Sequence, residues 1–393
     1  MEKGDSGIVY LDYAAATPVD PRVIEAMAPF WSTHYGNAGS LHAEGVLAKE
    51  ALTASRKTCA ELLGAREEEV IFTGSGTESN NLAIFGTVRI LEEEGIKVKD
   101  MHFITSSIEH PSVLDCFKDL ELRGANVTYL PVKESGRVNP NELKAELREN
   151  TVLVSIMYVN NEMGAIQPIE EIAKVIKDHM KKEKEATVRF HTDASQAALL
   201  LDLDVQTLGV DMLTLDAQKI YGPKGVGLLY KGRKTLLRPI MMGGSQEFGL
   251  RPSTENIPGI VGFAKAFSIV TEEQEAETAR LKELRDYCIE KIQKELPSGV
   301  INGPTREGLR YRTVNNVNVS FPEVEGEYLV IALSDRGFAC GTRSACIAGG
   351  GPSYVVTAMG RRALASNSLR ISLGRYSKKE DIDGLISAIR EIV

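Results

Sequence analysis

Short apolar segments alternate with longer segments of helical periodicity between about residues 20 and 260. Residues 43–63 have apolar positions at the spacing of one helix face, and Gly64 marks the predicted end. A buried strand is predicted at 69–72, and a glycine-containing turn leads from it into a second helix at 77–94. Further strand-like runs lie at 102–105, 127–130, 153–158, 188–191 and 212–215. This alternation indicates βαβ units and a mostly parallel sheet.

The pattern changes near residue 262. A long charged helix is predicted at 264–295, followed by strands at 314–321 and 368–373, a helix at 327–336 and a C-terminal helix. Strands and helices without strict alternation are typical of an α+β domain. We therefore predict an α/β protein with two domains, as its length of 393 residues also favours. The large domain, 18–262, has the sheet flanked by helices, and the small α+β domain combines 1–17 with 263–393.

Composition and charge narrow the classes of function. Apolar residues make up 43% and charged residues 25%, as in a globular protein with a sizeable core. The net charge of -8 argues against direct nucleic-acid binding. The first residues resemble no signal peptide and no run reaches ~18 apolar residues, so we expect a cytoplasmic protein without a membrane span. Five cysteines without a Cys-x-x-Cys pair favour neither a disulfide framework nor a metal site.

Unusual polar residues follow the predicted strands, where an open α/β sheet binds its ligands. They are Gly76, Thr77, His110, Asn161, Asp193 and Lys219. Gly76 and Thr77 open a helix, so backbone N–H groups and a hydroxyl there could hold an anion such as phosphate. An ordinary helix N-cap after a glycine turn explains the same pattern.

Asp193 and Lys219 each have two interpretations. Asp193 is either a helix N-cap or a carboxylate that faces a cationic ring nitrogen and keeps it protonated. Lys219 is either a solvated surface lysine or an amine fixed in a tight turn by the following Gly222 and Pro223. A lysine held in such a turn is partly desolvated, which lowers its pKa and allows it to form a Schiff base.

Cys346 differs from the other cysteines. Small residues precede it and Gly349 to Gly351 follow it, which predicts an exposed loop where the other cysteines fit buried, structural positions. A thiol on such a loop could enter a site and leave with a bound group.

Ordered motifs extend over nearly the whole chain. They lie at residues 10–17, 36–42, 77–81, 109–110, 160–162, 193–196 (Asp-Ala-Ser-Gln), 219–225 (Lys-Ile-Tyr-Gly-Pro-Lys-Gly), 251–256, 344–346 (Ser-Ala-Cys) and 369–374. Together they resemble the cysteine desulfurases of the NifS/IscS type, in the class V aminotransferase group of fold-type-I enzymes that use pyridoxal 5'-phosphate (PLP). The resemblance implies a fold-type-I PLP-dependent transferase.

The resemblance also implies roles for single residues. Lys219 would hold PLP covalently and move protons at the substrate carbon. The Cys346 thiolate, formed with the help of a base such as His110 or the substrate itself, would take sulfur from L-cysteine as a persulfide and leave alanine. Gly76, Thr77 and the neighbouring subunit's Thr254 would hold the phosphate, Asp193 would pair with the ring nitrogen, and His110 would stack on the ring. Asn161 and Gln196 would form hydrogen bonds with the ring hydroxyl. Gln218 stands where the family has a histidine, and it can still donate a hydrogen bond to the cofactor. Asn37 and Arg370 would bind the substrate carboxylate. The implied partners are a second copy in a homodimer and a sulfur-acceptor protein, such as an iron–sulfur scaffold or a tRNA-thiolation protein.

Two departures from the family pattern stand out. Asp216-Ala217-Gln218 replaces the usual Ser-x-His before the lysine, and residues 347–351 form a segment slightly shorter than usual. An aspartate would repel a phosphate, so we expect Asp216 to point elsewhere or to be bridged by a donor. The alternatives to a desulfurase are a selenocysteine lyase, another class-V aminotransferase-like enzyme, and a weakly active PLP-binding scaffold.

Overall fold

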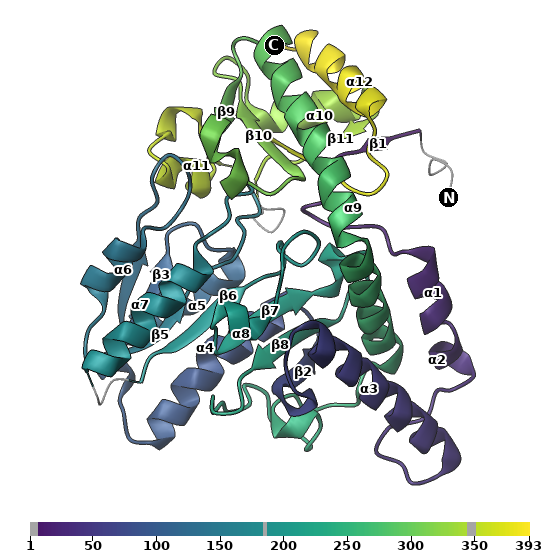
Figure 1. The fold of residues 1–393 in the computed structure, drawn as a ribbon, viewed down its shortest axis with the longest axis vertical. Coiled ribbons are helices and arrows are strands. Elements are labelled where there is room, and N and C mark those ends of the chain that lie inside the picture. Colours follow the sequence, from purple (N-terminus) through teal and green to yellow (C-terminus); the bar gives the residue numbers. More distant parts are fainter. Residues whose placement is uncertain (1–6, 184–186, 344–350) are drawn as a thin grey trace.

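The computed structural model describes residues 7–183, 187–343 and 351–393. Figure 1 shows a large domain around a central sheet and a smaller domain above it, joined by one long helix. The predicted combination of a large α/β domain and a small α+β region is confirmed in this arrangement.

The central sheet has seven strands in the order β2-β8-β7-β6-β5-β3-β4. Their bounds are β2 (Val70–Thr73), β3 (His102–Ser106), β4 (Asn126–Leu130), β5 (Thr151–Ser155), β6 (Arg189–Asp193), β7 (Met212–Asp216) and β8 (Gly227–Lys231). Strands β7, β6, β5, β3 and β4 pair in parallel, whereas β8 is antiparallel to both β2 and β7. The predicted mostly parallel sheet is therefore correct, and β8 is the exception because a short turn after Lys219 sends the chain back beside β7.

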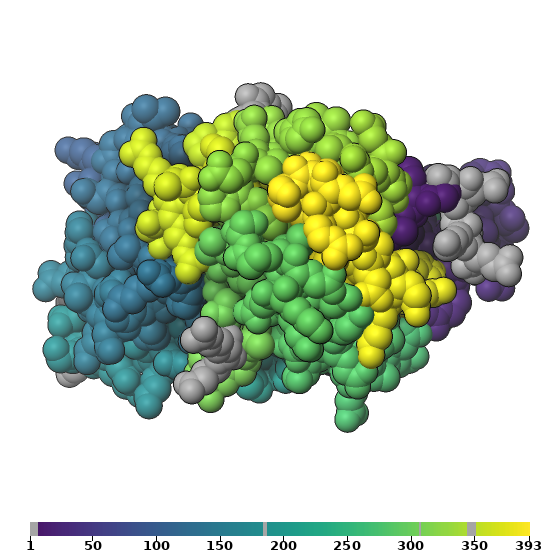
Figure 2. Space-filling model, turned by 90° about the horizontal axis from the view of Figure 1, so that it is seen from above, coloured from purple at the N-terminus to yellow at the C-terminus, as the bar shows by residue number. Residues whose placement is uncertain are grey.

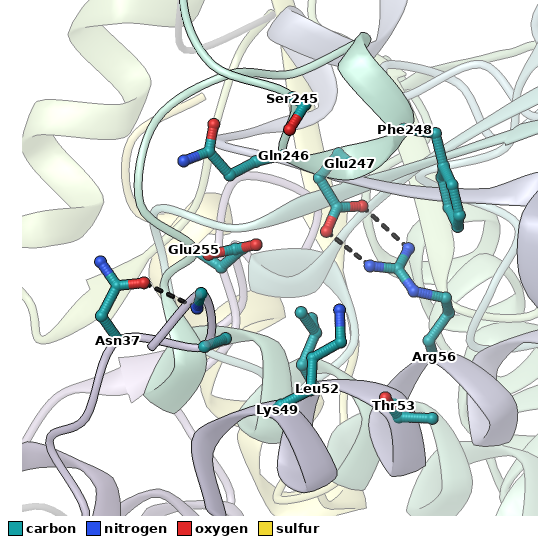
Figure 3. Close-up of a pocket in the computed structure, with 12 residues that line it drawn as sticks. Asn37, Lys49, Leu52, Thr53, Arg56, Ser245, Gln246, Glu247, Phe248 and Glu255 are labelled. Atoms are coloured by element: carbon teal, nitrogen blue, oxygen red, sulfur yellow. Dashed lines mark hydrogen bonds and ion pairs between the residues drawn. The ribbon is translucent and has the colours of Figure 1, made fainter. Parts of the chain in front are cut away.

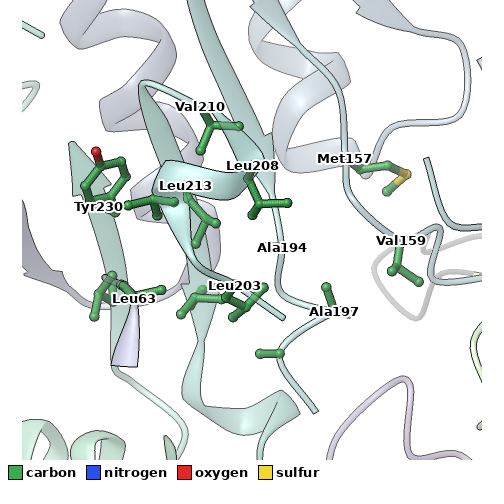
Figure 4. Packing of buried hydrophobic residues seen from close by; sticks show 14 of the residues in the cluster. Leu63, Met157, Val159, Ala194, Ala197, Leu203, Leu208, Val210, Leu213 and Tyr230 are labelled. Atoms are coloured by element: carbon green, nitrogen blue, oxygen red, sulfur yellow. The ribbon is translucent and has the colours of Figure 1, made fainter. Parts of the chain in front are cut away.

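Helices cover both faces of this sheet. They are α1 (Pro21–Met27), α2 (Pro29–Ser32), α3 (Ala43–Leu62), α4 (Gly76–Glu93), α5 (Pro111–Leu122), α6 (Pro140–Glu146), α7 (Ile169–Lys182) and α8 (Val205–Leu208). Successive strand residues point to opposite faces. Thus Phe72 and Leu213 pack with α3, α7 and α8, whereas Ile71 and Met212 pack with α4 and α5. Figure 4 shows part of the hydrophobic cluster that contains Phe72 and Leu213, with Leu213 beside Leu208 and Val210.

The small domain is built on a three-stranded antiparallel sheet in the order β12-β10-β9. Its elements are β9 (Val300–Asn302), β10 (Asn316–Ser320), β12 (Ser368–Ser372), α10 (Gly326–Ser334), α11 (Tyr354–Ala358) and α12 (Lys379–Arg390). The N-terminal strand β1 (Val9–Tyr10) pairs in parallel with β11 (Phe338–Ala339). This pairing joins the start of the chain to the small domain. Figure 2 looks onto this domain, where α12 packs against α9.

Helix α9 (Ile257–Glu295) connects the two domains as one helix of 39 residues. Its first half contributes Phe263 and Phe267 to the large-domain core, and its second half contributes Leu284 and Ile292 to the small-domain core. The helix starts before the predicted residue 264 because the Asn256 side chain caps it by accepting the Gly259 N–H. The predicted domain limit at residue 262 therefore falls inside a continuous helix. Within the described residues, no helix is long and apolar enough to cross a membrane.

Candidate active site

A cavity of about 280 Å³ lies at the carboxyl ends of the central strands. It brings together most of the predicted ligands, namely Gly76, Thr77, His110, Asn161, Asp193, Gln196, Gln218, Lys219 and Arg370. Asp193 and Asp216 end β6 and β7, and Gly76 begins the helix that follows β2. The small domain supplies Arg370 from β12, so both domains form the wall of the cavity.

Asp193 begins a chain of hydrogen bonds that reaches His110. Its Oδ2 accepts from Asn80 Nδ2 at 2.8 Å, and the same amide nitrogen donates to Ser112 Oγ at 2.9 Å. The Ser112 hydroxyl and backbone N–H both donate to His110 Nδ1, at 2.8 and 3.2 Å. The acceptor role of Nδ1 leaves the hydrogen of the neutral ring on Nε2. Two residues outside the predicted set, Asn80 and Ser112, therefore fix the orientation of His110 relative to Asp193.

His191 lies behind Asp193 on the same strand and is fully buried. Its ring nitrogens bond to Ser155 Oγ at 2.8 Å and Thr214 Oγ1 at 3.1 Å. Burial lowers the pKa of His191 to about 4. The neutral imidazole does not neutralise Asp193, which leaves that carboxylate as an anion for a cation in the cavity.

Lys219 ends a 3-10 turn, η3 (Ala217–Lys219), and reaches the segment that follows β1. Its Nζ donates to the backbone oxygens of Ala15 at 2.6 Å and Ala14 at 3.0 Å. Thr17 Oγ1 fixes the turn by donating to Gln218 O and accepting the Tyr221 N–H. Tyr221 adopts a φ of 61°, a conformation that a large side chain rarely takes. The predicted tight turn thus holds the lysine at the cavity wall.

Arg370 and Asn161 each have one buried polar atom that no described residue binds. Arg370 is 1% exposed; its Nη2 pairs with Asp12 Oδ1 at 2.8 Å and its Nη1 donates to Asn161 O at 3.2 Å. Neither Arg370 Nε nor Asn161 Oδ1 has a hydrogen-bond partner among the described residues. Buried polar atoms without partners are costly, so this wall is suited to a polar ligand.

The end of the cavity at helix α4 contains an unexpected carboxylate. Asp216 Oδ2 accepts the Gly76 N–H at 3.0 Å, and Gln218 Nε2 donates to the same oxygen at 3.3 Å. Of the two predicted alternatives, Asp216 therefore does not point away from the cavity and is held by donors instead. Gln196 has a different partner, since its Nε2 donates to Ala14 O at 2.9 Å.

Cys346 lies outside the described residues, but both flanks of its segment are described. Before it, Gly341 pairs with Arg370 through N–H···O bonds of 3.0 and 2.6 Å. After it, the Tyr354 hydroxyl donates to Glu109 O at 2.5 Å. Arg343 Nη1 also donates to Gly351 O at 2.6 Å, which ties the two flanks together. The described residues on either side of this segment therefore contact Arg370, which lines the cavity, and Glu109, which precedes His110.

Asn37 and Thr254 are the predicted ligands that this chain does not bring into the cavity. Asn37 accepts the Gly39 N–H and lines a separate cavity with Gln246 and Glu255, as Figure 3 shows. Thr254 is exposed on the loop before α9. The binding of the substrate carboxylate by Asn37 and of the neighbouring subunit's phosphate by Thr254 therefore remain predictions.

Sequence reasoning missed Asn80, Ser112 and Asp12 as positioning residues. Asn80 follows Gly76 by four positions on α4, so the two share one helix face. That spacing was a usable signal. No such signal existed for Asp12, because its partner Arg370 is remote in the sequence. There was none for Ser112 either, because a serine beside a helix cap is common in many sequences.

Comparisons with known proteins agree with this geometry. Residues 9–385 match the class-V aminotransferase family. The chain is 42% identical over 387 residues to the cysteine desulfurase IscS of Dictyoglomus turgidum, covering 98% of this chain and 94% of that protein. A solved NifS-like protein superposes with a TM-score of 0.89 at 35% identity, covering 98% and 99% of the two chains. A structure described as SspA in complex with cysteine gives a TM-score of 0.77 at 37% identity, covering 94% and 99%.

Proposed function

Because the chain belongs to the class-V aminotransferase family and is a cysteine desulfurase, we propose that its cavity holds PLP on Lys219 and that Cys346 receives the sulfur of L-cysteine. One observation carries the proposal. The Lys219 amine and the Asp193 carboxylate, separate in sequence, line the same cavity with His110.

The residues present fit the ring of PLP. The cofactor has an aldehyde, a ring hydroxyl and a ring nitrogen that becomes cationic. The cavity offers an amine, the Asp193 carboxylate, and an amide oxygen on Asn161 that has no partner among the described residues. When bound, PLP supplies an electron sink for the substrate carbon. An opposite charge at hydrogen-bond distance would keep the ring nitrogen protonated. His110, with Nδ1 engaged by Ser112, would present its ring to the cofactor.

Lys219 has two tasks in this proposal. It would hold the cofactor through its amine, and it would accept and return a proton at the substrate's α-carbon. The carbonyl groups of Ala14 and Ala15 bind the amine in the present structure. The same carbonyl groups can receive Lys219 again when it is released.

The substrate carboxylate would bind at Arg370. Its guanidinium already has Asp12 and the Asn161 carbonyl on two nitrogens, and Nε has no partner among the described residues. An arginine whose other donors are fixed loses little freedom when it binds a carboxylate. Asp12 would then act as the residue that positions Arg370.

Cys346 would complete the reaction by nucleophilic attack on the substrate sulfur. A new S–S bond forms, the substrate Cβ–S bond breaks, and the released electron pair is protonated at Cβ to give alanine. The flanks of its segment support this role, because they are bonded to Arg370 and to Glu109, the residue before His110. The persulfide would pass its sulfur to an acceptor protein, such as an iron–sulfur scaffold or a tRNA-thiolation protein.

We further propose a cytoplasmic homodimer. The described cysteines, Cys59, Cys116, Cys288 and Cys340, are all free thiols, which suits a reducing compartment. The exposed Thr254 would reach the phosphate of the neighbouring subunit's cofactor, since it lies outside the cavity of its own chain.

The test measures alanine and sulfide released from L-cysteine with a reducing agent, together with the visible absorbance of PLP. Cys346→Ala should lower both products at least about a hundredfold and keep the absorbance. Cys116→Ala is the matched control: burial raises the pKa of the Cys116 thiol to about 12, so this thiol is no nucleophile. Full alanine release by Cys346→Ala would overturn the persulfide route, and a colourless protein that cannot take up PLP would favour the scaffold alternative.

A further inference from the structure

Asp216 ends β7 at the α4 side of the cavity and is 8% exposed. Three donors fix its carboxylate: the Gly76 N–H and Gln218 Nε2 at Oδ2, and the Gln218 backbone N–H at Oδ1, at 3.2 Å. The bond to Oδ1 is an ordinary cap of the η3 turn. The bond from the Gly76 N–H to Oδ2 needs another explanation, because it joins residues 140 positions apart.

Gly76 is the first residue of α4, a helix of 18 residues. N–H groups at a helix N-terminus attract anions, and the family resemblance places the cofactor phosphate here. The Asp216 carboxylate already accepts the Gly76 N–H, and it lies so close that a Cβ added to Gly76 would come within 3.2 Å of Asp216 Cβ and Oδ2. The protein therefore supplies its own anion at this position.

No lysine or arginine among the described residues forms an ion pair with Asp216. Among the described residues that line the cavity, Lys219 and Arg370 are the only lysine and arginine, and both are assigned to the aldehyde and the substrate. Glu78, the other carboxylate at the start of α4, binds Arg251 at 2.9 Å and the Gly74 N–H at 2.7 Å and does not line the cavity. In the described part of the cavity wall, the Asp216 carboxylate is therefore the charged group that is assigned neither to another part of the cofactor nor to the substrate. Like charges at short distance in a partly buried site repel, so it would oppose the binding of a phosphate dianion.

We propose that Asp216 competes with the cofactor phosphate for the Gly76 N–H, so that the phosphate adds little to cofactor affinity and the cofactor exchanges readily. The inference rests on the proposed PLP function and concerns how this chain, unlike one with a hydroxyl at position 216, holds the cofactor. It makes Asp216 a residue that sets specificity between phosphorylated and unphosphorylated ligands.

The experiment compares two probes, 4-deoxypyridoxine and its phosphate ester, on the full-length protein stripped of cofactor. Neither probe has an aldehyde, so neither forms a bond with Lys219, and the ratio of their two dissociation constants isolates the phosphate. Calorimetry at about pH 8 keeps the phosphate of the ester fully ionised. Asp216→Asn removes the charge at constant size, Asp216→Ser shortens the side chain, and Glu78→Gln removes one charge from the same helix end outside the cavity.

The wild-type protein and Glu78→Gln should bind the phosphate ester less than about tenfold tighter than the free alcohol. Asp216→Asn and Asp216→Ser should raise that ratio at least about tenfold while the affinity for the unphosphorylated probe stays constant. An equal ratio in wild type and Asp216→Asn overturns the proposal, as does a loss of affinity for the unphosphorylated probe in both Asp216 variants. Binding of neither probe to wild type or variants would instead refute the PLP function itself.

Discussion

Glu109 precedes His110 and shows how one residue can make stability depend on pH. It is fully buried; its carboxylate accepts the Ser106 hydroxyl at 2.5 Å and the Met157 N–H at 2.9 and 3.0 Å. Burial outweighs these bonds and raises the pKa of Glu109 from near 4.5 to about 8. The folded protein therefore binds this proton more tightly than the unfolded chain does. The stability that the group contributes is complete below pH ~4.5 and is lost as the pH rises through ~8.

Glu109→Gln should remove this dependence, because glutamine has the shape of the protonated acid. The variant should melt within a degree or two of wild type near pH ~5 and several degrees higher near pH ~9, a difference of roughly 3–5 kcal/mol in unfolding free energy. Scanning calorimetry of both proteins at several pH values measures it. A melting difference that stays constant with pH would show that Glu109 is ionised in the folded protein across this range.

The sequence was sufficient to place Lys219, Asp193 and His110 in one cavity, because all three follow strands and parallel strands end at one edge of the sheet. It was insufficient for Asp216. Whether that side chain reaches Gly76 depends on how α4 packs across β8 and β7, a contact between residues 140 positions apart that no local pattern encodes.

At the scale of elements, Arg375 ties the small domain to the turn that carries Lys219. Its guanidinium pairs with Asp20 and with Glu273 on α9 at 2.5 Å, and it lies 4.4 Å from the ring centre of Tyr221. Asp20 is 3% exposed, and Arg22 and Arg375 lower its pKa to about 2. The Asp20 N–H in turn donates to Tyr221 O at 2.9 Å. One arginine thereby supports the strained Tyr221 backbone.

Arg375→Ala should destabilise the protein by about 2 kcal/mol, since Asp20 stays buried with only Arg22 as its partner. It should also speed the loss of bound cofactor, because the η3 turn loses support. Arg390→Ala is the control: this arginine is exposed and has one long contact of 3.5 Å to Glu295, so its removal should change little. Equal melting temperatures and equal cofactor loss in the two variants would contradict the role of Arg375.

The elements themselves were largely predictable, and the exceptions have physical causes. The helix at residues 43–63 and the strand at 212–215 were expected within a residue of their observed limits. The antiparallel β8 was not identified as such, because an apolar run carries no information about strand direction. The sequence also did not show that α9 belongs to both cores. The apolar periodicity of a helix stays the same where its packing partner changes from one domain to the other, so it does not mark that change.

At the scale of the whole molecule, two predicted ligands point to a second copy of the chain. Asn37 and the loop that holds Thr254 flank a cavity of about 330 Å³ that is separate from the Lys219 site. Phe248, which lines it, is 59% exposed, and Leu41, which follows the lining residue Gly39 by two positions in the sequence, is 99% exposed. Phe248 also has a φ of 59°. Exposed apolar residues that gather near functional loops are typical of an interface.

A homodimer through this region would bury Leu41 and Phe248 and bring Thr254 to the neighbouring site. Replacing both Leu41 and Phe248 by glutamate should therefore give a monomer of 42.9 kDa, in place of a wild-type species of twice that mass, and should weaken cofactor retention. Leu122→Glu is the matched control, because Leu122 is 89% exposed on α5 and lines neither cavity. Sedimentation equilibrium gives the masses, and dialysis followed by absorbance gives the retention. A double variant that stays dimeric and keeps its cofactor would place the interface elsewhere, whereas a monomeric wild type with full activity would show that one chain completes its own site.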